Sequence, residues 1–293
     1  MSNQRTFWIT WAVCLLLNAI ACLLLYTGFI SYGIVLFCVL PGCIGLFTGF
    51  IPRRVFAIVG MVAALLTIFL LLWAGQVEGI VCILMALPIV GVSVLVGYLF
   101  GIIIKRLSRK EDSLKISFLP IVLFGLAVLV NHVWKGGGSE NTVTTTIELN
   151  ASSADVYNHI KQVDTVIAKR HFLHELGLPY PHKCVLTAER EGGQRICEFD
   201  AGRIVETIVQ LKKDELLRMK VSEYDLPGAS WFAFDEDIYQ IRSVGNVTRI
   251  SRTTTVFSKL KPRLYWEQIE KLTIGIQQEL VFENLKNEIE QKR

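Results

Sequence analysis

The chain has 293 residues, of which 52% are hydrophobic, and it carries a formal net charge of +4. The length suggests two domains, and a mean hydropathy of +0.45 is too high for a pair of ordinary soluble domains. Both signs of charge are mixed in the polar half of the chain, without a basic stripe, which argues against binding to nucleic acid.

The first part of the chain is almost free of charge. Between Thr6 and Ile104 the only ionisable side chains, apart from cysteines and tyrosines, are Arg53, Arg54 and Glu78. A helix needs about 20 apolar residues to cross a hydrocarbon core of about 30 Å. Five runs approach or exceed that length: residues 7–27, 31–51, 55–74, 78–104 and 117–134. The sequence therefore predicts a transmembrane helical domain over residues 1–134. The first run lacks a small-residue cleavage site, so we expect it to stay in the mature protein.

Basic residues predict the orientation of these spans. Arg5, the pair Arg53–Arg54 and the loop 105–115 fall on one side of a five-span bundle, and the positive-inside rule assigns that side to the cytoplasm. The domain after the fifth span is then extracytoplasmic. The fifth run is short and holds Pro120, Asn131 and His132. If only four runs cross, the same domain faces the cytoplasm, so both counts stay open.

Two glycine motifs, "GLFTG" (45–49) and "GYLFG" (97–101), have the spacing that lets helix backbones approach closely. They predict helix packing inside the bundle, with a homodimer through the same faces as the alternative. Pro41 and Pro88 lie mid-span, where proline kinks a helix. Ionisable groups are nearly absent inside the runs, which argues against a transporter or pump.

The composition changes at a glycine-rich linker, residues 135–141, which reaches at most about 25 Å at about 3.5 Å per residue. After it, the β-branched run "TVTTTIEL" (142–149) predicts a strand. Ser152, with Asp155 three residues later, then predicts a capped helix over 153–160. We therefore expect a folded domain over 142–293 that is tethered close to the membrane.

Six further strands and one long helix complete this domain. The strands are predicted in "CVLTAE", "QRICEF", "RIVETIVQL", "LLRMKVSE", "FDEDIYQIRS" and "VTRISRTTTVF". Residues 262–291 predict a helix of about 45 Å. Two apolar sets lie on nearly opposite sides of that helix and predict that it is covered on both: Ile269, Leu272, Ile276 and Leu280, and Ile274, Val281, Leu285 and Ile289.

Three motifs carry a resemblance to a known family: "GLPYP" (177–181), "GGQRICEFDAGRIVETI" (192–208) and "TTTVFSKLKPRLYW" (253–266). Residues 142–291 resemble the START-related (SRPBCC) helix-grip superfamily, which includes polyketide cyclases/dehydrases and lipid-transport proteins, and within it a bacterial membrane-anchored subgroup. The resemblance implies an α+β domain in which a curved, seven-stranded antiparallel sheet grips a long C-terminal helix around an apolar cavity. Relatives often carry histidines on that helix, where this chain has Gly275, Gln278 and Asn284, so a catalytic role for such histidines is in doubt here.

Strand register predicts which residues face the cavity. If "DAG" (200–202) is a tight turn, residues whose numbers sum to about 401 lie opposite one another, which pairs Arg195 with Glu206. The cavity candidates are Arg195, Cys197, Phe199, Ile204, Glu206, Ile208, Met219, Val221, Tyr265 and Trp266. An inward Arg195–Glu206 pair is either a polar anchor for a ligand or an internal or rim pair that fixes the sheet. Tyr265 and Trp266 either pack the helix start against the sheet or gate the cavity mouth.

The remaining reactive side chains do not form a recognisable catalytic or metal-binding set. The predicted turn "REGG" (190–193) does not place Cys184 opposite Cys197, so no disulfide is implied. His171 and His174 can share a helix face but lack a third ligand, and a solvated surface or cavity rim suits them better. We expect no metal, no cofactor and no catalytic residue.

The leading hypothesis is therefore an integral protein of the bacterial cytoplasmic membrane that binds a lipid or other hydrophobic small molecule, with transport of that ligand as an extension of the same hypothesis. Its partners would be the bilayer and that ligand. The first alternative is a cyclase/dehydratase-like enzyme that uses Arg195, Glu206 and Tyr239 or a histidine as acid and base. The second is a membrane-bound ligand sensor or interaction protein in which the long helix contacts the spans.

Overall fold

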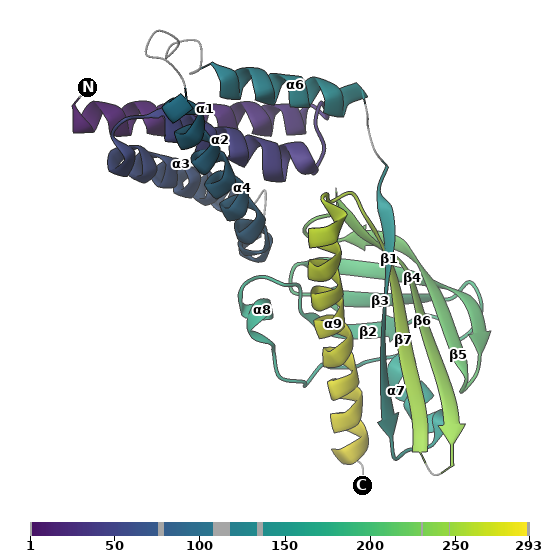
Figure 1. Cartoon of the computed structure of the whole chain (residues 1–293). Helices are drawn as coiled ribbons and strands as arrows, with labels where there is room; N and C mark the ends of the chain where they lie inside the picture. The colour runs from purple at the N-terminus through teal and green to yellow at the C-terminus, as the bar shows by residue number, and fades with distance from the viewer. Residues whose placement is uncertain are drawn as a thin grey trace. The chain divides into compact units, whose positions relative to one another are not determined.

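The computed structural model describes residues 2–75, 79–107, 118–133, 137–229, 231–245 and 247–291. The chain forms two compact units (Figure 1). The first comprises Met1–Gly137 and Lys259–Tyr265, and the second comprises Gly138–Ser258 and Trp266–Arg293.

The first unit consists of apolar helices. Three of them are long and apolar enough to cross a membrane: α1 (Asn3–Tyr26), α3 (Arg54–Ala74) and α4 (Ile80–Leu107). The π-helical turn η1 (Val35–Val39), which continues into α2 (Leu40–Phe50), and helix α6 (Leu119–Val133) are apolar but shorter. Three of the five predicted spans therefore have full length, and a count of five is not confirmed.

The two glycine motifs pack against each other within one chain. A Cβ atom added to Gly45 would lie 2.0 Å from the carbonyl oxygen of Val94, and one added to Gly97 would lie 1.9 Å from that of Gly42. Gly49 and Gly101 approach each other in the same way. Because any side chain at these positions would collide with backbone, the glycines are what allows α2 and α4 to make contact. The predicted packing inside the bundle is observed, and it occupies the faces that a homodimer would need.

The lysines and arginines that the structure describes within residues 2–133 lie at one end of the helices. Arg53 Nη1 donates to Asn3 Oδ1 at 2.6 Å, and Lys105 Nζ donates to the carbonyl oxygen of Phe50 at 2.7 Å. The last turn of α6 lies at the other end, where the ring of His132 stacks on Phe29 at 4.0 Å. Most of the predicted basic loop 105–115 falls outside the described residues.

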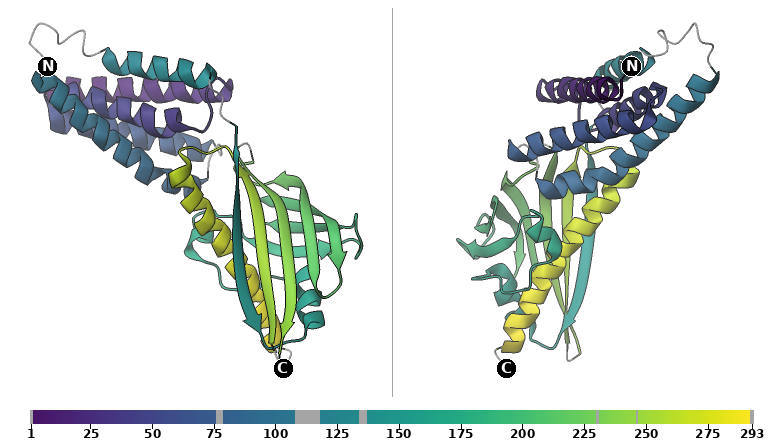
Figure 2. Two further views of the ribbon diagram at one scale, coloured as in Figure 1. Left: turned by 45° about the vertical axis from the view of Figure 1, so that its right-hand side comes forward. Right: turned by 90° about the vertical axis from the view of Figure 1, so that its left-hand side faces the viewer.

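The second unit is a seven-stranded antiparallel sheet with one long helix. Its strands are β1 (Ser139–Leu149), β2 (Pro181–Leu186), β3 (Gln194–Phe199), β4 (Gly202–Lys212), β5 (Leu216–Asp225), β6 (Phe232–Val244) and β7 (Val247–Ser258). Their order in the sheet is β1-β7-β6-β5-β4-β3-β2. The sheet curves around α9 (Arg263–Gln291), as Figure 2 shows. The predicted α+β helix-grip architecture is confirmed.

Two short helices connect β1 to β2. Helix α7 (Ser153–Lys161) begins as predicted, because Ser152 Oγ accepts from the backbone N–H of Asp155 at 3.1 Å. Helix α8 (Phe172–Glu175) lies in the segment that follows. This segment packs against α9, where Gln277 Nε2 donates to the carbonyl of Pro179 at 2.6 Å.

Helix α9 is covered on two sides, as predicted, and Ile274, Leu280 and Leu285 of the two predicted sets are buried. Several of its other buried residues were not predicted. Leu272 is 55% exposed, whereas Glu270, Gln278 and Asn284 are at most 3% exposed. These polar side chains have specific partners: Gln278 Nε2 donates to Thr254 Oγ1 at 2.8 Å, and Asn141 Nδ2 donates to Glu270 Oε2 at 3.1 Å. The helix therefore attaches to the sheet partly through hydrogen bonds, which hydrophobic periodicity does not register.

Candidate functional site

The concave face of the sheet, which faces α9, carries most of the predicted site residues. Strand β3 pairs with β4 in the predicted register, with Arg195 opposite Glu206 and Cys197 opposite Ile204. Strand β5 continues the same face, with Met219 opposite Ile208 and Val221 opposite Glu206. The tight turn forms because Gly202 adopts a φ of 138°, and a Cβ atom there would lie 1.9 Å from the carbonyl oxygen of Asp225.

The predicted pair of Arg195 and Glu206 lies at the middle of this face. Arg195 Nε donates to Glu206 Oε2 at 2.8 Å, and Nη1 donates to the carbonyl of Ile160 in the last turn of α7 at 3.1 Å. Both side chains are about 5% exposed. Burial opposes the charge on both partners and raises the pKa of the Glu206 carboxyl, against the lowering effect of Arg195. Because these bonds are internal, they favour a pair that ties β3, β4 and α7 together over a free ligand anchor.

A second buried ion pair lies beside the first and was not predicted. Arg252 donates to Asp237 Oδ2 at 2.9 Å from Nε and 2.5 Å from Nη2, and its Nε also donates to Oδ1 at 3.1 Å. Thr254 Oγ1 donates to Oδ1 at 2.7 Å. The ring of Tyr239 lies between the two arginines, 5.4 Å from the guanidinium of Arg195 and 5.2 Å from that of Arg252. Burial raises the pKa of the Tyr239 hydroxyl. Two guanidinium groups, two carboxylates and one phenol thus form a single buried polar cluster.

The turn between β6 and β7 could have revealed this cluster. The strands meet with Val244 opposite Val247, so residues whose numbers sum to 491 are paired. The same arithmetic that places Arg195 opposite Glu206 then places Tyr239 opposite Arg252 and Asp237 opposite Thr254. The residues on either side of "VGN" therefore contained the register that predicts this cluster.

On one side of the polar cluster the concave face is filled by a hydrophobic core. Leu217 and Met219 are 0% exposed, and Ile208 is 1% exposed. They pack in one cluster with residues of α7 and with Phe282 and Leu285 of α9. We call this region the closed end. Ile208 and Met219, which were predicted to line a ligand cavity, are therefore core residues of the closed end.

On the other side of the cluster the concave face carries aromatic side chains that are only partly buried. Tyr224 lies opposite Ile204, Phe234 opposite Val256 and Phe232 opposite Ser258. The ring centroids of Phe234 lie 5.7 Å from Tyr224 and 5.4 Å from Phe232. A β-bulge between Phe234 and Glu236 keeps Phe234 on the same face as Asp237. We call this region the open end; none of its three aromatic residues was predicted.

Cys197 and Phe199, two of the predicted cavity residues, lie at the edge of the sheet beside the open end. Cys197 forms a disulfide with Cys184, which lies directly opposite it on β2. The expectation that these cysteines are not opposite one another was wrong. The loop between β2 and β3 is longer than the predicted turn, since Leu186 rather than Glu189 is the last paired residue of β2. Phe199 packs against the disulfide together with Val163.

Tyr265 and Trp266 are adjacent in sequence but fall in different units. Trp266, in the second unit, is 4% exposed. That it packs the start of α9 against the sheet remains a prediction. Tyr265 belongs to the first unit and is partly exposed.

The histidine pair has a structural role in helix α8. His171 Nδ1 accepts from the backbone N–H of Leu173 at 3.3 Å, and His174 Nδ1 accepts from that of His171 at 3.2 Å. His174 is 3% exposed, so the expected solvated surface is wrong for this residue. Its ring stacks edge-on against Tyr180 at 5.4 Å, and burial lowers its pKa below 6.5. Within the described ranges, no three His, Cys, Asp or Glu side chains are grouped as a metal site.

Comparison with known proteins supports a likeness of fold only. No family model and no curated protein matches the sequence. Among solved structures, a START superfamily protein from Mycobacterium smegmatis is 17% identical, with a TM-score of 0.38, and the match covers 52% of this chain and 99% of that chain. A truncated norcoclaurine synthase from Thalictrum flavum is 12% identical, with a TM-score of 0.37, covering 53% of this chain and 96% of that one. The resemblance to START-related helix-grip proteins holds for the fold, whose curved seven-stranded sheet and long C-terminal helix are those that it implies.

Proposed function

We propose that the second unit binds a lipid or other hydrophobic small molecule at the open end of its concave face. The observation that carries this proposal is the contrast in burial along that face. Leu217 and Met219 at the closed end are 0% exposed, whereas Tyr224, Phe232 and Phe234 keep part of their surface accessible. Aromatic side chains bury about 150–250 Å² each when fully covered, so a ligand over these rings gains apolar contact that the chain itself does not supply.

The polar cluster would limit how far such a ligand enters. Asp237 and Thr254 lie on the concave face next to Phe234 and Val256, and their hydrogen bonds already involve Arg252 and Gln278. Displacing these bonds would leave buried charges unpaired, which costs several kcal/mol. The apolar part of the ligand would therefore occupy the aromatic region, and a polar group of the ligand would lie nearest the cluster or solvent.

Binding can be tested with the full chain purified in a non-ionic detergent, using a fluorescent fatty acid as the probe. Phe234→Ala should weaken binding at least about tenfold, because it removes the central ring of the open end. Phe257→Ala is the matched control, since Phe257 is partly exposed on the opposite face of the neighbouring strand. Equal affinities for the wild type and both variants, or no binding by the wild type, would refute the proposal.

The first unit would anchor this domain in a membrane. Large apolar side chains are exposed on the outside of its helices, including Leu70 at 59%, Leu95 at 56% and Leu129 at 58%. Water does not favour such a surface, whereas lipid does. Buried threonines inside the bundle are satisfied within their own helices; for example, Thr10 Oγ1 donates to the carbonyl of Thr6 at 2.9 Å. These features support the predicted integral membrane protein.

Three observations support an extracytoplasmic second unit. The described lysines and arginines within residues 2–133 gather at one end of the helices, whereas α6 ends at the other, near Phe29. The chain continues from there to β1, in the second unit, where Cys184 and Cys197 form a disulfide, a bond typical of oxidising compartments. A reporter that is active only outside the cytoplasm, fused after Arg293, should be active, and an equally expressed fusion without activity would place the domain in the cytoplasm.

The enzymatic alternative lacks a specific observation in its favour. Acid–base catalysis would require Glu206 or Tyr239 to contact a substrate. Glu206 is 5% exposed and Tyr239 is 1% exposed, and both belong to the internal polar cluster.

A further inference from the structure

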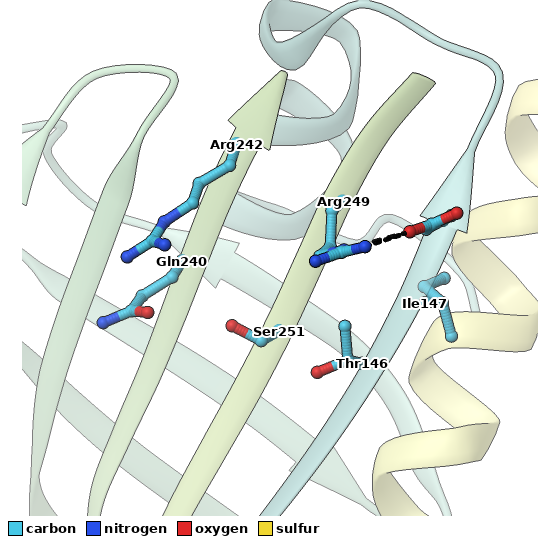
Figure 3. Close-up of a pocket in the computed structure, with 7 residues that line it drawn as sticks. Thr146, Ile147, Gln240, Arg242, Arg249 and Ser251 are labelled. Atoms are coloured by element: carbon cyan, nitrogen blue, oxygen red, sulfur yellow. Dashed lines mark hydrogen bonds and ion pairs between the residues drawn. The ribbon is translucent and has the colours of Figure 1, made fainter. Parts of the chain in front are cut away.

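The outer face of the sheet, opposite α9, carries a polar pocket that plays no part in the proposed ligand site. The pocket has a volume of about 420 Å³. It is lined by residues from three adjacent strands: Thr146, Ile147 and Glu148 of β1, Arg249 and Ser251 of β7, and Gln240 and Arg242 of β6. Figure 3 shows Thr146, Gln240, Arg242, Arg249 and Ser251 on these three strands. The guanidinium of Arg249 is hydrogen-bonded to Glu148.

The register explains why the pocket is rich in hydrogen-bond donors. Arg242 lies directly opposite Arg249, which lies directly opposite Glu148. Two residues further along the strands, Gln240 lies opposite Ser251, which lies opposite Thr146. Alternate residues share a face, so the two rows form one grid of polar side chains.

The charges in this grid do not balance. Arg249 donates to Glu148 Oε1 at 2.6 Å and 3.0 Å. Arg242, which is exposed, has no carboxylate within ion-pair distance among the residues described. Like charges that lie directly opposite on adjacent strands destabilise a sheet by up to about 1 kcal/mol. An exposed surface of this kind has no packing reason to place two arginines opposite one another, and such local conflicts are typical of functional positions.

We propose that this pocket binds an oxyanion, specifically a phosphate group, either free or as the headgroup of an amphiphile. The guanidinium of Arg242 supplies the charge and two parallel N–H donors. The Ser251 and Thr146 hydroxyls and the Gln240 amide supply neutral donors in the adjacent row. Glu148 holds Arg249 away from the anion, so Arg249 contributes its charge and only secondarily its donors.

The proposal can be tested by isothermal titration calorimetry on the full chain in non-ionic detergent and phosphate-free buffer, at fixed ionic strength. The probes are inorganic phosphate and a water-soluble, short-chain phosphatidic acid. Arg242→Gln should weaken binding at least about tenfold, because it removes the only unpaired cation of the grid. Glu148→Gln should strengthen binding several-fold, because it releases Arg249.

Matched control variants distinguish binding of the anion in this pocket from its general attraction to positive charge on the protein. Arg203 and Glu223 form an exposed pair of similar geometry elsewhere on the sheet, at 3.1 Å. Arg203→Gln and Glu223→Gln change the net charge by the same amounts and should leave the affinity unchanged. Binding of both probes with equal affinity would identify phosphate alone as the ligand, and preference for the lipid would identify a headgroup. No binding of either probe, or equal losses in Arg242→Gln and Arg203→Gln, would overturn the proposal.

Discussion

The two ends of the concave face are built from the same strands but are stabilised differently. At the closed end, aliphatic side chains from β4 and β5 pack against Phe282 and Leu285 of α9 and exclude water. At the open end, aromatic side chains from β5 and β6 remain partly accessible, and the nearby sheet edge is held by a disulfide. The buried polar cluster separates the two. The closed end thus stabilises the fold, whereas the open end has surface available for a ligand.

The largest effect is expected at the boundary between the two ends. Arg195→Met should lower the free energy of unfolding by about 4 to 5 kcal/mol, because it leaves Glu206 buried without its partner and removes the bond to the carbonyl of Ile160. Urea unfolding monitored by far-ultraviolet circular dichroism measures this change.

A double variant tests whether the loss of stability comes from the unpaired charge of Glu206 or from lost packing around Arg195. Arg195→Met combined with Glu206→Leu should recover most of the loss, because no buried charge remains. Arg203→Met, which breaks the exposed pair with Glu223, should change stability by less than about 1 kcal/mol. If the double variant is no more stable than Arg195→Met alone, the buried charge is not the cause.

Shortening a side chain at the closed end should lower the stability of the fold without changing ligand affinity. Leu217→Ala removes a fully buried side chain and should cost about 3 to 4 kcal/mol. Under conditions where the variant is folded, its affinity for the fluorescent fatty acid should equal that of the wild type. A parallel loss of affinity in Leu217→Ala and Phe234→Ala would show that the two ends do not act separately.

The pairing of neighbouring strands could be predicted from the sequence where the turn between them is short. The turn "DAG" determined the pairing of Arg195 with Glu206 because a two-residue connection allows only one register. The pairing of Cys184 with Cys197 was missed because a longer loop permits several registers, and the sequence does not indicate where β2 ends.

Helix α9 shows a second limit of prediction from sequence. Its buried residues include Glu270, Gln278 and Asn284. Their partners lie far away in the sequence: Gln278 bonds to Thr254, and Asn284 accepts from the backbone N–H of Ile167. Hydrophobic periodicity assigns polar residues to the solvent, so it selected a face containing the exposed Leu272. The open end was missed for a related reason, since the bulge before Glu236 reverses the alternation of β6.

The disulfide beside the open end should stabilise the folded chain. Replacing Cys184 and Cys197 together by alanine should lower the free energy of unfolding by about 2 to 3 kcal/mol, because a closed loop of this length restricts the unfolded chain. Unfolding by urea with and without reductant provides the measurement. The wild type under reducing conditions should match the double variant. If reduction destabilises the double variant as much as the wild type, the effect does not come from this bond.

The smallest expected effect concerns the segment between α7 and β2, which packs against α9. Burial lowers the pKa of His174 below 6.5, so between the two values the unfolded chain binds more protons than the folded chain. The stabilising contribution is therefore present above about pH 6.5 and is lost as the pH falls through the lower, folded value. His174 Nε2 has no hydrogen-bond partner among the described residues, and Arg170 lies nearby, so a proton on this ring is poorly accommodated.

The free energy of unfolding, measured at pH 7.5 and at pH 5, should fall on acidification by at most about 1.4 kcal/mol for each unit by which the pKa of His174 is lowered. His174→Asn keeps an acceptor for the backbone N–H of His171 and should reduce this fall, whereas the same change at the partly exposed His159 should not. An unchanged pH dependence in His174→Asn would assign the acid sensitivity to groups outside this segment.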